Sequence, residues 1–271
     1  MIQYQANCVT VFESVLYQTT TTVIENEKMI LLIDPNWLPT EVSEIKQYVD
    51  ERLSDKKLYL IFTHSDFDHI IAAGAFPNAY IIASEAFENN PNKSEIIETI
   101  HAFDHMYYLN RPYDIYYPTV DKVIKEGHTK VNLDGFEIDF YLAPGHTEDG
   151  LITYIKELET LIVGDYLSDV EFPFITSSYT DYQRTIKCVE EIIMSNKVSV
   201  LIPGHGTVAV DHQMITERIN DSKWYLSELG LGNNIDKELA LKYQYYASMK
   251  KAHKNNRVFF LKEFNKGDSN D

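Results

Sequence analysis

Cysteine is scarce in this chain, and long apolar runs are absent. Only Cys8 and Cys188 occur among the 271 residues, and they form no CxxC motif. This usage suits a reducing compartment, although the two could form one disulfide, and their apolar surroundings favour buried free thiols. No apolar run approaches the roughly 20 residues that a membrane helix needs, and residues 1–7 lack the basic segment and apolar core of a signal peptide. The sequence therefore predicts a soluble, cytoplasmic protein.

Basic residues are also few relative to acidic ones. The chain has 24 Lys and Arg against 41 Asp and Glu, which gives a formal net charge of -17. Such a charge repels polyanions, so binding to nucleic acid or to an anionic membrane surface is not expected. A small-molecule substrate is the expected partner, and a homodimer is left open by the sequence.

The hydrophobic content of 44% is ample for a packed core in one large domain. The patterning predicts strands at 7–12, 16–24, 29–33, 58–62, 80–83, 136–142, 151–155, 161–163 and 198–202. It predicts helices at 39–53, 70–75, 94–109 and 180–193, and a mainly helical tail. We interpret residues 1–271 as a single domain with an insertion lying over the site at 85–120 and a helical tail at 211–271. Disorder is expected only at 265–271.

The most informative stretch is Thr-His-Ser-Asp-Phe-Asp-His, which begins at Thr63. His64, Asp66, Asp68 and His69 all carry strong metal-ligand side chains within six residues. They directly follow the apolar run at 58–62, which we interpret as a buried strand. Residues just after a strand lie at one edge of its sheet, so these four side chains can face a common cleft. The stretch therefore predicts a metal site for zinc, iron or manganese.

Further ligand-type residues stand at the ends of other apolar runs. His146 and His205 each follow a Pro-Gly pair, while Asp165 and Asp34 end shorter runs. The proline stops the strand, and the glycine allows an unusual turn that can aim the imidazole over the sheet edge. Taken singly, such a histidine is more often structural, and such an aspartate is usually a turn former or helix cap. Their joint recurrence at strand ends favours one metal centre.

The set Asp34, His64, Asp66, Asp68, His69, His146, Asp165 and His205, in this order and spacing, resembles the metallo-β-lactamase superfamily over residues 29–206. The resemblance implies an α/β fold, a four-layer αββα sandwich with two mixed sheets face to face, helices outside and a metal site at one edge. It implies that His64 and His146 bind a first metal ion and that Asp68, His69 and His205 bind a second. Asp165 would bridge the two, and Asp34 would orient a loop or ligand by hydrogen bonding.

One position departs from the usual family motif HxHxDH, because Asp66 replaces the middle histidine. A carboxylate is shorter and harder than an imidazole, and its charge weakens the Lewis acidity of the first metal. Three outcomes are open: Asp66 binds directly, it binds through water, or the first site is weak. The flavodiiron group has a glutamate at this position. This likeness favours iron or manganese over zinc as the bound metal.

The resemblance implies a hydrolase with two divalent metal ions, zinc first, with iron or manganese as alternatives. A metal-bound hydroxide would cleave a small ester-like substrate: an ester, lactone, thioester or phosphodiester. Asp68 or Asp66 would pass a proton to the leaving group. Arg111, Tyr108 and Tyr113 are candidates for substrate contacts in the insertion.

Two other classes of function remain as alternatives. One is a redox enzyme, either di-iron and flavodiiron-like or mono-iron and persulfide dioxygenase-like. The other is a non-catalytic binding module with a degraded site. Two zinc or manganese ions per chain would favour the hydrolase, iron would favour the redox enzyme, and no metal would favour the binding module.

Overall fold

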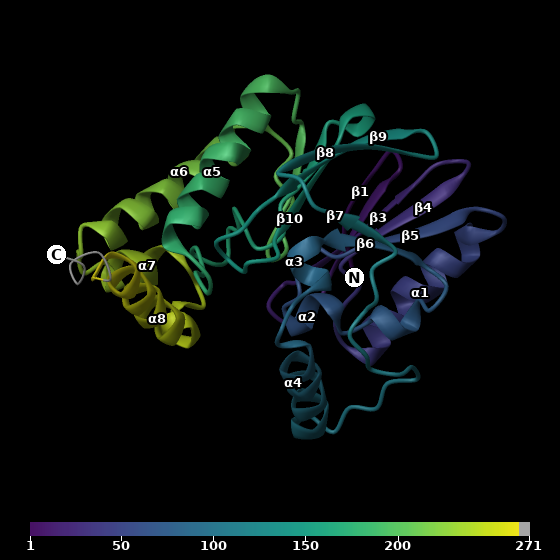
Figure 1. Cartoon of the computed structure of the whole chain (residues 1–271), viewed down its shortest axis with the longest axis horizontal. Helices are drawn as coiled ribbons and strands as arrows, with labels where there is room; N and C mark the ends of the chain where they lie inside the picture. Colours follow the sequence, from purple (N-terminus) through teal and green to yellow (C-terminus); the bar gives the residue numbers. More distant parts are fainter. Residues whose placement is uncertain (266–271) are drawn as a thin grey trace.

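The computed structural model describes residues 1–265, which form four layers with two β-sheets face to face between layers of helices (Figure 1). This is the αββα sandwich that the resemblance implies. The expected disorder at 265–271 falls almost entirely outside the described residues. Among the described helices, none combines the length and the apolar character needed to span a bilayer.

The first sheet has seven strands in sequence order. They are β1 (Ile2–Ala6), β2 (Val9–Glu13), β3 (Thr20–Glu25), β4 (Met29–Ile33), β5 (Lys57–Ile61), β6 (Tyr80–Ser84) and β7 (Lys122–Ile124). The first four strands pair antiparallel and the last four pair parallel. The carboxyl ends of β4, β5 and β6 therefore meet at one edge.

The second sheet has five strands in the order β12-β11-β10-β9-β8. They are β8 (His128–Leu133), β9 (Phe136–Leu142), β10 (Leu151–Ile155), β11 (Thr160–Ile162) and β12 (Val200–Ile202). Only the β11–β12 pair is parallel. Both sheets are therefore mixed.

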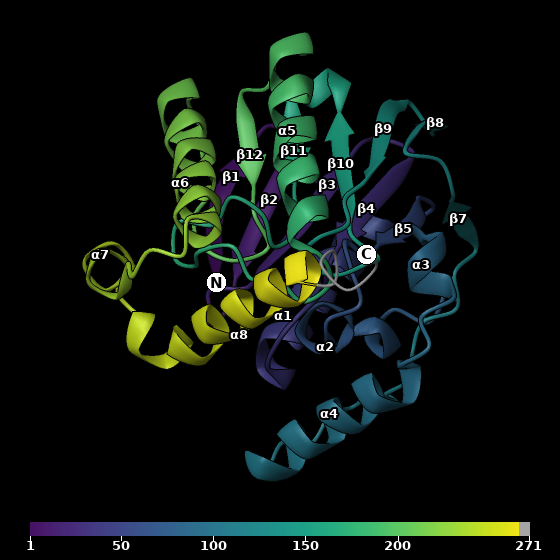
Figure 2. The same cartoon turned by 60° about the vertical axis from the view of Figure 1, so that its left-hand side comes forward.

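Two sets of helices cover the outer faces (Figures 1 and 2). The first sheet carries α1 (Pro39–Leu53), α2 (Phe67–Ile70), α3 (Glu85–Glu88) and α4 (Lys93–Met106), with a short 3-10 turn at Ala73–Ala75. The second sheet carries α5 (Tyr179–Ser195), α6 (His212–Gly230), α7 (Asp236–Lys242) and α8 (Tyr246–Asn265), and a 3-10 turn at Lys156–Leu158 precedes β11. The last three helices lie beyond the region of resemblance.

Strand β4 shows why the apolar runs are continuous. Met29, Leu31 and Ile33 face the core between the two sheets, whereas Ile30 and Leu32 face the core beneath the first layer of helices. Successive side chains of a strand point to opposite faces, so a strand covered on both sides needs apolar residues throughout. In β4 no polar residue interrupts the run, and Asp34 follows directly after its end.

Some predicted elements differ from the structure. The strand predicted at 16–24 begins only at Thr20, because Tyr17 and Gln18 have positive φ angles of 55° and 50° and form a turn. Strand β1 was not predicted. The helical tail predicted at 211–271 consists of α6, α7 and α8 within the described residues. Both cysteines are free and half-buried.

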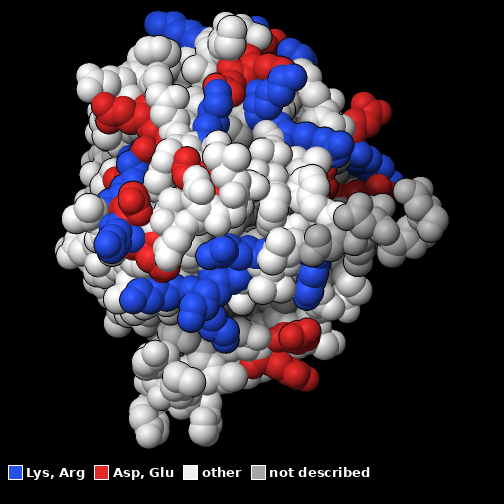
Figure 3. Space-filling model, turned by 90° about the vertical axis from the view of Figure 1, so that its left-hand side faces the viewer, with Lys and Arg blue, Asp and Glu red and all other residues white. Residues whose placement is uncertain are grey.

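The negative charge is not spread evenly over the surface. Figure 3 shows basic side chains gathered on the face of the C-terminal helices, where α8 has exposed Lys250, Lys251, Lys254 and Arg257. The exclusion of polyanionic partners, which rests on net charge, stays a prediction.

Candidate metal centre

The ligand-type residues converge at the edge where strands of both sheets end. The loop after β5 supplies His64 and Asp66, α2 supplies Asp68 and His69, and the loops after β9, β11 and β12 supply His146, Asp165 and His205. Possible ligand atoms lie within 4.8 Å of one another in two groups: His64, Asp66, His146 and Asp165, and then Asp68, His69 and His205. All seven predicted ligands therefore come together.

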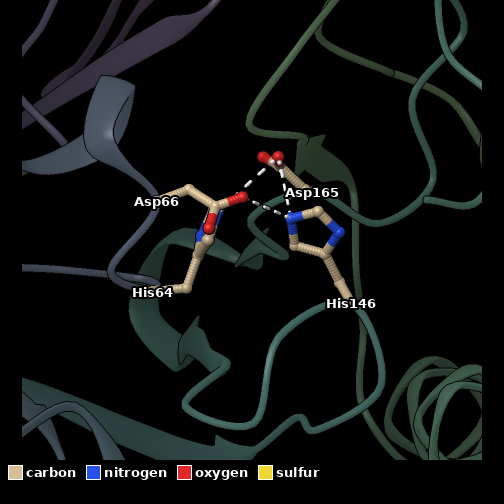
Figure 4. A group of neighbouring side chains, drawn as sticks. All are labelled: His64, Asp66, His146 and Asp165. Atoms are coloured by element: carbon tan, nitrogen blue, oxygen red, sulfur yellow. Dashed lines mark ion pairs between the residues drawn. The ribbon is translucent and has the colours of Figure 1, made fainter. Parts of the chain in front are cut away.

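The first group has distances that suit one cation (Figure 4). The His146 Nε2 atom lies 3.3 Å from Oδ2 of both Asp66 and Asp165. The His64 Nε2 atom lies 3.6 Å from Asp165 Oδ2 and 3.8 Å from Asp66 Oδ2. Ligand atoms about 2.0–2.1 Å from a tetrahedral zinc ion are about 3.3 Å apart. The four side chains are thus nearly in position to surround one ion.

The second group has similar separations. The Asp68 Oδ2 atom lies 3.6 Å from His69 Nε2 and 3.5 Å from His205 Nε2. Asp165 reaches this group too, with Oδ1 3.1 Å from His69 Nε2 and Oδ2 3.2 Å from His205 Nε2. Asp165 is therefore shared by the two groups, as a bridging carboxylate would be.

Several atoms at the centre lack hydrogen-bond partners among the described residues. His64 Nε2, His146 Nε2 and Asp165 Oδ1 are all buried and unpartnered. Leaving buried polar atoms unpaired costs about 1–3 kcal/mol each, so such atoms call for a further group. A metal ion fits these residues, because neutral imidazole nitrogens and carboxylate oxygens are its usual donors.

Asp34 holds the rings of His69 and, through Thr63, of His64 on their Nδ1 side. Its Oδ1 accepts from the Thr63 backbone N–H at 2.9 Å, and its Oδ2 accepts from the Thr63 hydroxyl and from His69 Nδ1, the latter at 3.0 Å. The Thr63 hydroxyl in turn accepts from His64 Nδ1 at 2.9 Å. With Nδ1 acting as the donor, each ring presents Nε2 to the cluster. Asp34 therefore lies where it can hold the ring of His69 directly and that of His64 through Thr63.

The other two histidines are held by backbone carbonyls. His146 Nδ1 donates to the Phe174 carbonyl at 2.8 Å, and His205 Nδ1 donates to the Tyr17 carbonyl at 3.0 Å. The loop around Phe174 is fixed by buried Asn256 of α8, whose side chain bonds to the backbone of Pro173 and Ile175. A helix outside the ligand-bearing region therefore supports the site.

Asp34→Asn is expected to lower metal affinity about 10–100-fold, the usual cost of losing an orienting partner of a metal-binding histidine. The amide has one acceptor oxygen in place of two, so it cannot accept all three bonds that Asp34 accepts, from the Thr63 backbone N–H, the Thr63 hydroxyl and His69 Nδ1. Competition titration against a chromophoric chelator measures this affinity. Asp50→Asn on the exposed face of α1 is the matched control, and equal affinities in the two variants would contradict the orienting role.

The carboxylates dominate the electrostatics of the cluster. Burial lowers the pKa of His205, but Asp165 and its acidic neighbours outweigh burial and raise it to about 10. The pKa values of His69 and His146 are likewise raised well above the ordinary value. Burial raises the pKa of Asp165, yet the surrounding histidines hold it well below the ordinary value. The site thus attracts positive charge, which cations can supply.

Neither Pro-Gly-His turn has room for a Cβ at its glycine, since at Gly145 it would lie 2.3 Å from Tyr182 Cα, and Gly145 also needs its backbone conformation. Gly145 has φ 131°, the left-handed region that the sequence predicts for such a turn. At Gly204 the reason is space, because a Cβ there would lie 2.1 Å from Asp165 Oδ1. The second glycine lets the backbone pass directly against the shared carboxylate.

The predicted substrate residues lie in the segment that packs beside α2. The Arg111 side chain is only 1% exposed and pairs with both carboxylate oxygens of Asp104 at 2.8 Å. It also donates to the Trp37 carbonyl and to the Tyr113 hydroxyl. Tyr108, by contrast, is 92% exposed. Arg111 and Tyr113 thus tie the insertion to the fold, and a substrate role for the three stays an untested prediction.

Sequence reasoning missed Glu171. A carboxylate oxygen of Glu171 lies within 4.8 Å of ligand atoms of Asp165 and His205. The residue stands in an irregular loop between β11 and α5, six positions after Asp165, and no motif marks it. The signal available was only its place in a loop that already carries a ligand.

The sandwich and the His/Asp cluster at its edge define a class of αββα proteins with a candidate metal centre. The family model described as "Metallo-beta-lactamase superfamily" matches residues 15–205, most of the chain. The chain belongs to the metallo-beta-lactamase superfamily. No functionally curated protein matches this sequence.

Solved structures share the fold. The stereoselective inverting sec-alkylsulfatase Pisa1 from Pseudomonas sp. aligns with TM-score 0.63 and 15% identity over 88% of this chain and 43% of its own, so this chain spans less than half its length. The archaeal superfamily protein ST1585 from Sulfolobus tokodaii aligns with TM-score 0.56 and 20% identity over 82% of this chain and 87% of its own. A metallo-beta-lactamase from Pontibacter korlensis aligns with TM-score 0.56 and 14% identity over 82% of this chain and 98% of its own. At such identities the likeness shows the fold alone.

Proposed function

We propose that this protein is a metal-dependent hydrolase of small ester-like substrates with a binuclear centre. The observation that carries the proposal is the sharing of Asp165 between two groups of ligand atoms. His64, Asp66 and His146 would hold one cation with Asp165, and Asp68, His69 and His205 would hold the other. Zinc is the first candidate, with manganese and iron as alternatives.

The position of Asp66 supports direct binding. Its Oδ2 stands as close to His146 Nε2 as Asp165 does, at 3.3 Å. Its side chain is 43% exposed, whereas those of His64 and His146 are buried. Asp66 is therefore the ligand on the open side of the first group, where it adjoins an arriving substrate.

When bound, a pair of such cations lowers the pKa of a water molecule from about 15.7 towards 7, which provides a nucleophile at neutral pH. The protein contributes orientation, because the Nδ1 bonds of four histidines fix their rings before substrate arrives. Asp68 and Asp66 have carboxylate oxygens at the centre, where they can take up a proton and pass it to the leaving group. A carbonyl, phosphoryl or sulfate ester is compatible with this arrangement.

The test is metal analysis followed by a substrate screen. Protein purified without added metal or chelator is analysed by mass spectrometry and then assayed with ester, lactone, thioester, phosphodiester and secondary alkyl sulfate substrates. We expect close to two zinc or manganese ions per chain and turnover of one class. Two bound ions without turnover of any class would contradict the hydrolase.

The redox alternative is favoured by one observation, the carboxylate of Asp66 in a ligand position. Carboxylate donors are harder than imidazole and suit iron. Two iron ions per chain, together with oxygen consumption when a reductant is supplied, would place this function first. One iron would indicate the mono-iron form, and no metal would indicate a binding module.

A further inference from the structure

Glu171 lies against the second group of ligands. Its carboxylate has an oxygen within 4.8 Å of possible ligand atoms of both Asp165 and His205. Asp165 and His205 are themselves 3.2 Å apart through Oδ2 and Nε2. These three donors therefore surround a common point on the side of the second cation.

The backbone around Glu171 is held on both sides. The Ser168 hydroxyl oxygen accepts from the Glu171 backbone N–H at 3.1 Å. The next residue, Phe172, is buried and stacks on Tyr225 of α6 with ring centroids 5.0 Å apart. Asn256 then fixes the carbonyl of Pro173. The loop cannot readily swing away, so the glutamate side chain has a defined base.

Among the described residues, no lysine or arginine pairs with the Glu171 carboxylate. Within residues 1–265 its oxygens form no hydrogen bond and no ion pair. Burial raises the pKa of Glu171, and the carboxylates of Asp165 and Asp68 add to that effect against the lowering by His205. The carboxylates of Glu171, Asp165 and Asp68 repel one another, and a cation bound between them would relieve that repulsion.

We propose that Glu171 is a ligand of the second cation, alongside Asp68, His69, His205 and Asp165, and that it biases this position towards manganese or iron over zinc. The inference rests on the proposed two-cation site. It brings the carboxylates of that site to four with Asp66, Asp68 and Asp165. Five donors with three carboxylates exceed the four-coordinate set that zinc usually takes and suit ions that prefer oxygen and higher coordination.

The experiment measures binding of a metal ion to the apoprotein. Wild type, Glu171→Gln and Glu148→Gln are stripped with chelator, dialysed and titrated separately with Mn²⁺ and Zn²⁺ by calorimetry. Glu148 is the matched control, because it is exposed, carries the same charge and stands in the loop after His146. The melting temperature of each apoprotein is measured in parallel.

We expect wild type and Glu148→Gln to bind two Mn²⁺, and Glu171→Gln to bind the second at least tenfold more weakly, with a smaller loss for Zn²⁺. The apo Glu171→Gln protein should melt no lower than wild type, because it loses a repelling charge. A lower melting temperature with unchanged Mn²⁺ affinity would mean a structural role and overturn the proposal. Unchanged Mn²⁺ and Zn²⁺ affinities would also overturn it.

Two further outcomes are distinguishable. If Glu171→Gln does not fold, Glu171→Met keeps the length without an oxygen donor and must show the same loss of Mn²⁺ binding. Failure of wild type itself to bind a second ion would remove the two-cation basis of the proposed function, and with it this inference. That result appears in the wild-type titration alone, whereas failure of the Glu171 proposal appears only in the variants.

Discussion

Replacing Asp165 with alanine is expected to reduce metal content from near two ions to less than one per chain and to lower turnover at least about 1000-fold. Loss of a partner outside the ligand set already costs about 10–100-fold in metal affinity or activity, and Asp165 stands in both groups. Its oxygens lie 3.1–3.6 Å from the Nε2 atoms of all four histidines of the site. Asp66 and Asp68 each contact only two of these four histidines, so neither replaces Asp165.

Metal content by mass spectrometry and turnover on the substrate found in the screen check this result together. Asp55→Ala serves as the control, because Asp55 is exposed and carries the same charge. Full activity with two bound ions in the Asp165 variant would refute the assignment of the centre.

Removing the metal ions is expected to lower the melting temperature by about 15 °C or more. A ligand present at 1000 times its dissociation constant stabilises the folded state by about 4 kcal/mol, so two such ions contribute about 8 kcal/mol. For a chain of this size each kcal/mol moves the melting temperature by about 2–4 °C. The stripped site also leaves several carboxylates close together, including Asp66, Asp68 and Asp165.

Differential scanning calorimetry before and after chelation, followed by addition of Zn²⁺ or Mn²⁺, measures the shift. Re-addition should restore the original transition. The Asp165→Ala protein provides the comparison, since its transition should respond little to chelator. A chelator-insensitive wild type that still contains metal would contradict this prediction.

The sequence predicted the gathering of the ligand-type residues because their signal is local. His64, His146 and His205 each follow an apolar run, and the ends of buried strands meet at one sheet edge. The motif order then indicated the fold, which the family match and the structure confirm. Strand β4 is an example: it is covered on both faces, so its consecutive residues are all apolar.

Other features depend on contacts between distant segments and had no local signal. Glu171 lies at the centre in a loop whose next residues, Phe172 and Pro173, contact the C-terminal helices. The turn at Tyr17 interrupts a run that reads as strand, and its carbonyl is needed by His205, 188 residues away. Arg111 stood among tyrosines, yet its partner is Asp104 on α4.

The hydrogen bonds from Asn256 to the loop after β11 determine where the chain can be truncated without disturbing the candidate centre. A fragment ending at residue 205 would contain every ligand predicted from the sequence and the whole region matched by the family. It would lack α8, so the Phe174 carbonyl that accepts from His146 would lose its support. The minimal unit that preserves this centre therefore extends through Asn256, and a motif-based boundary would cut inside it.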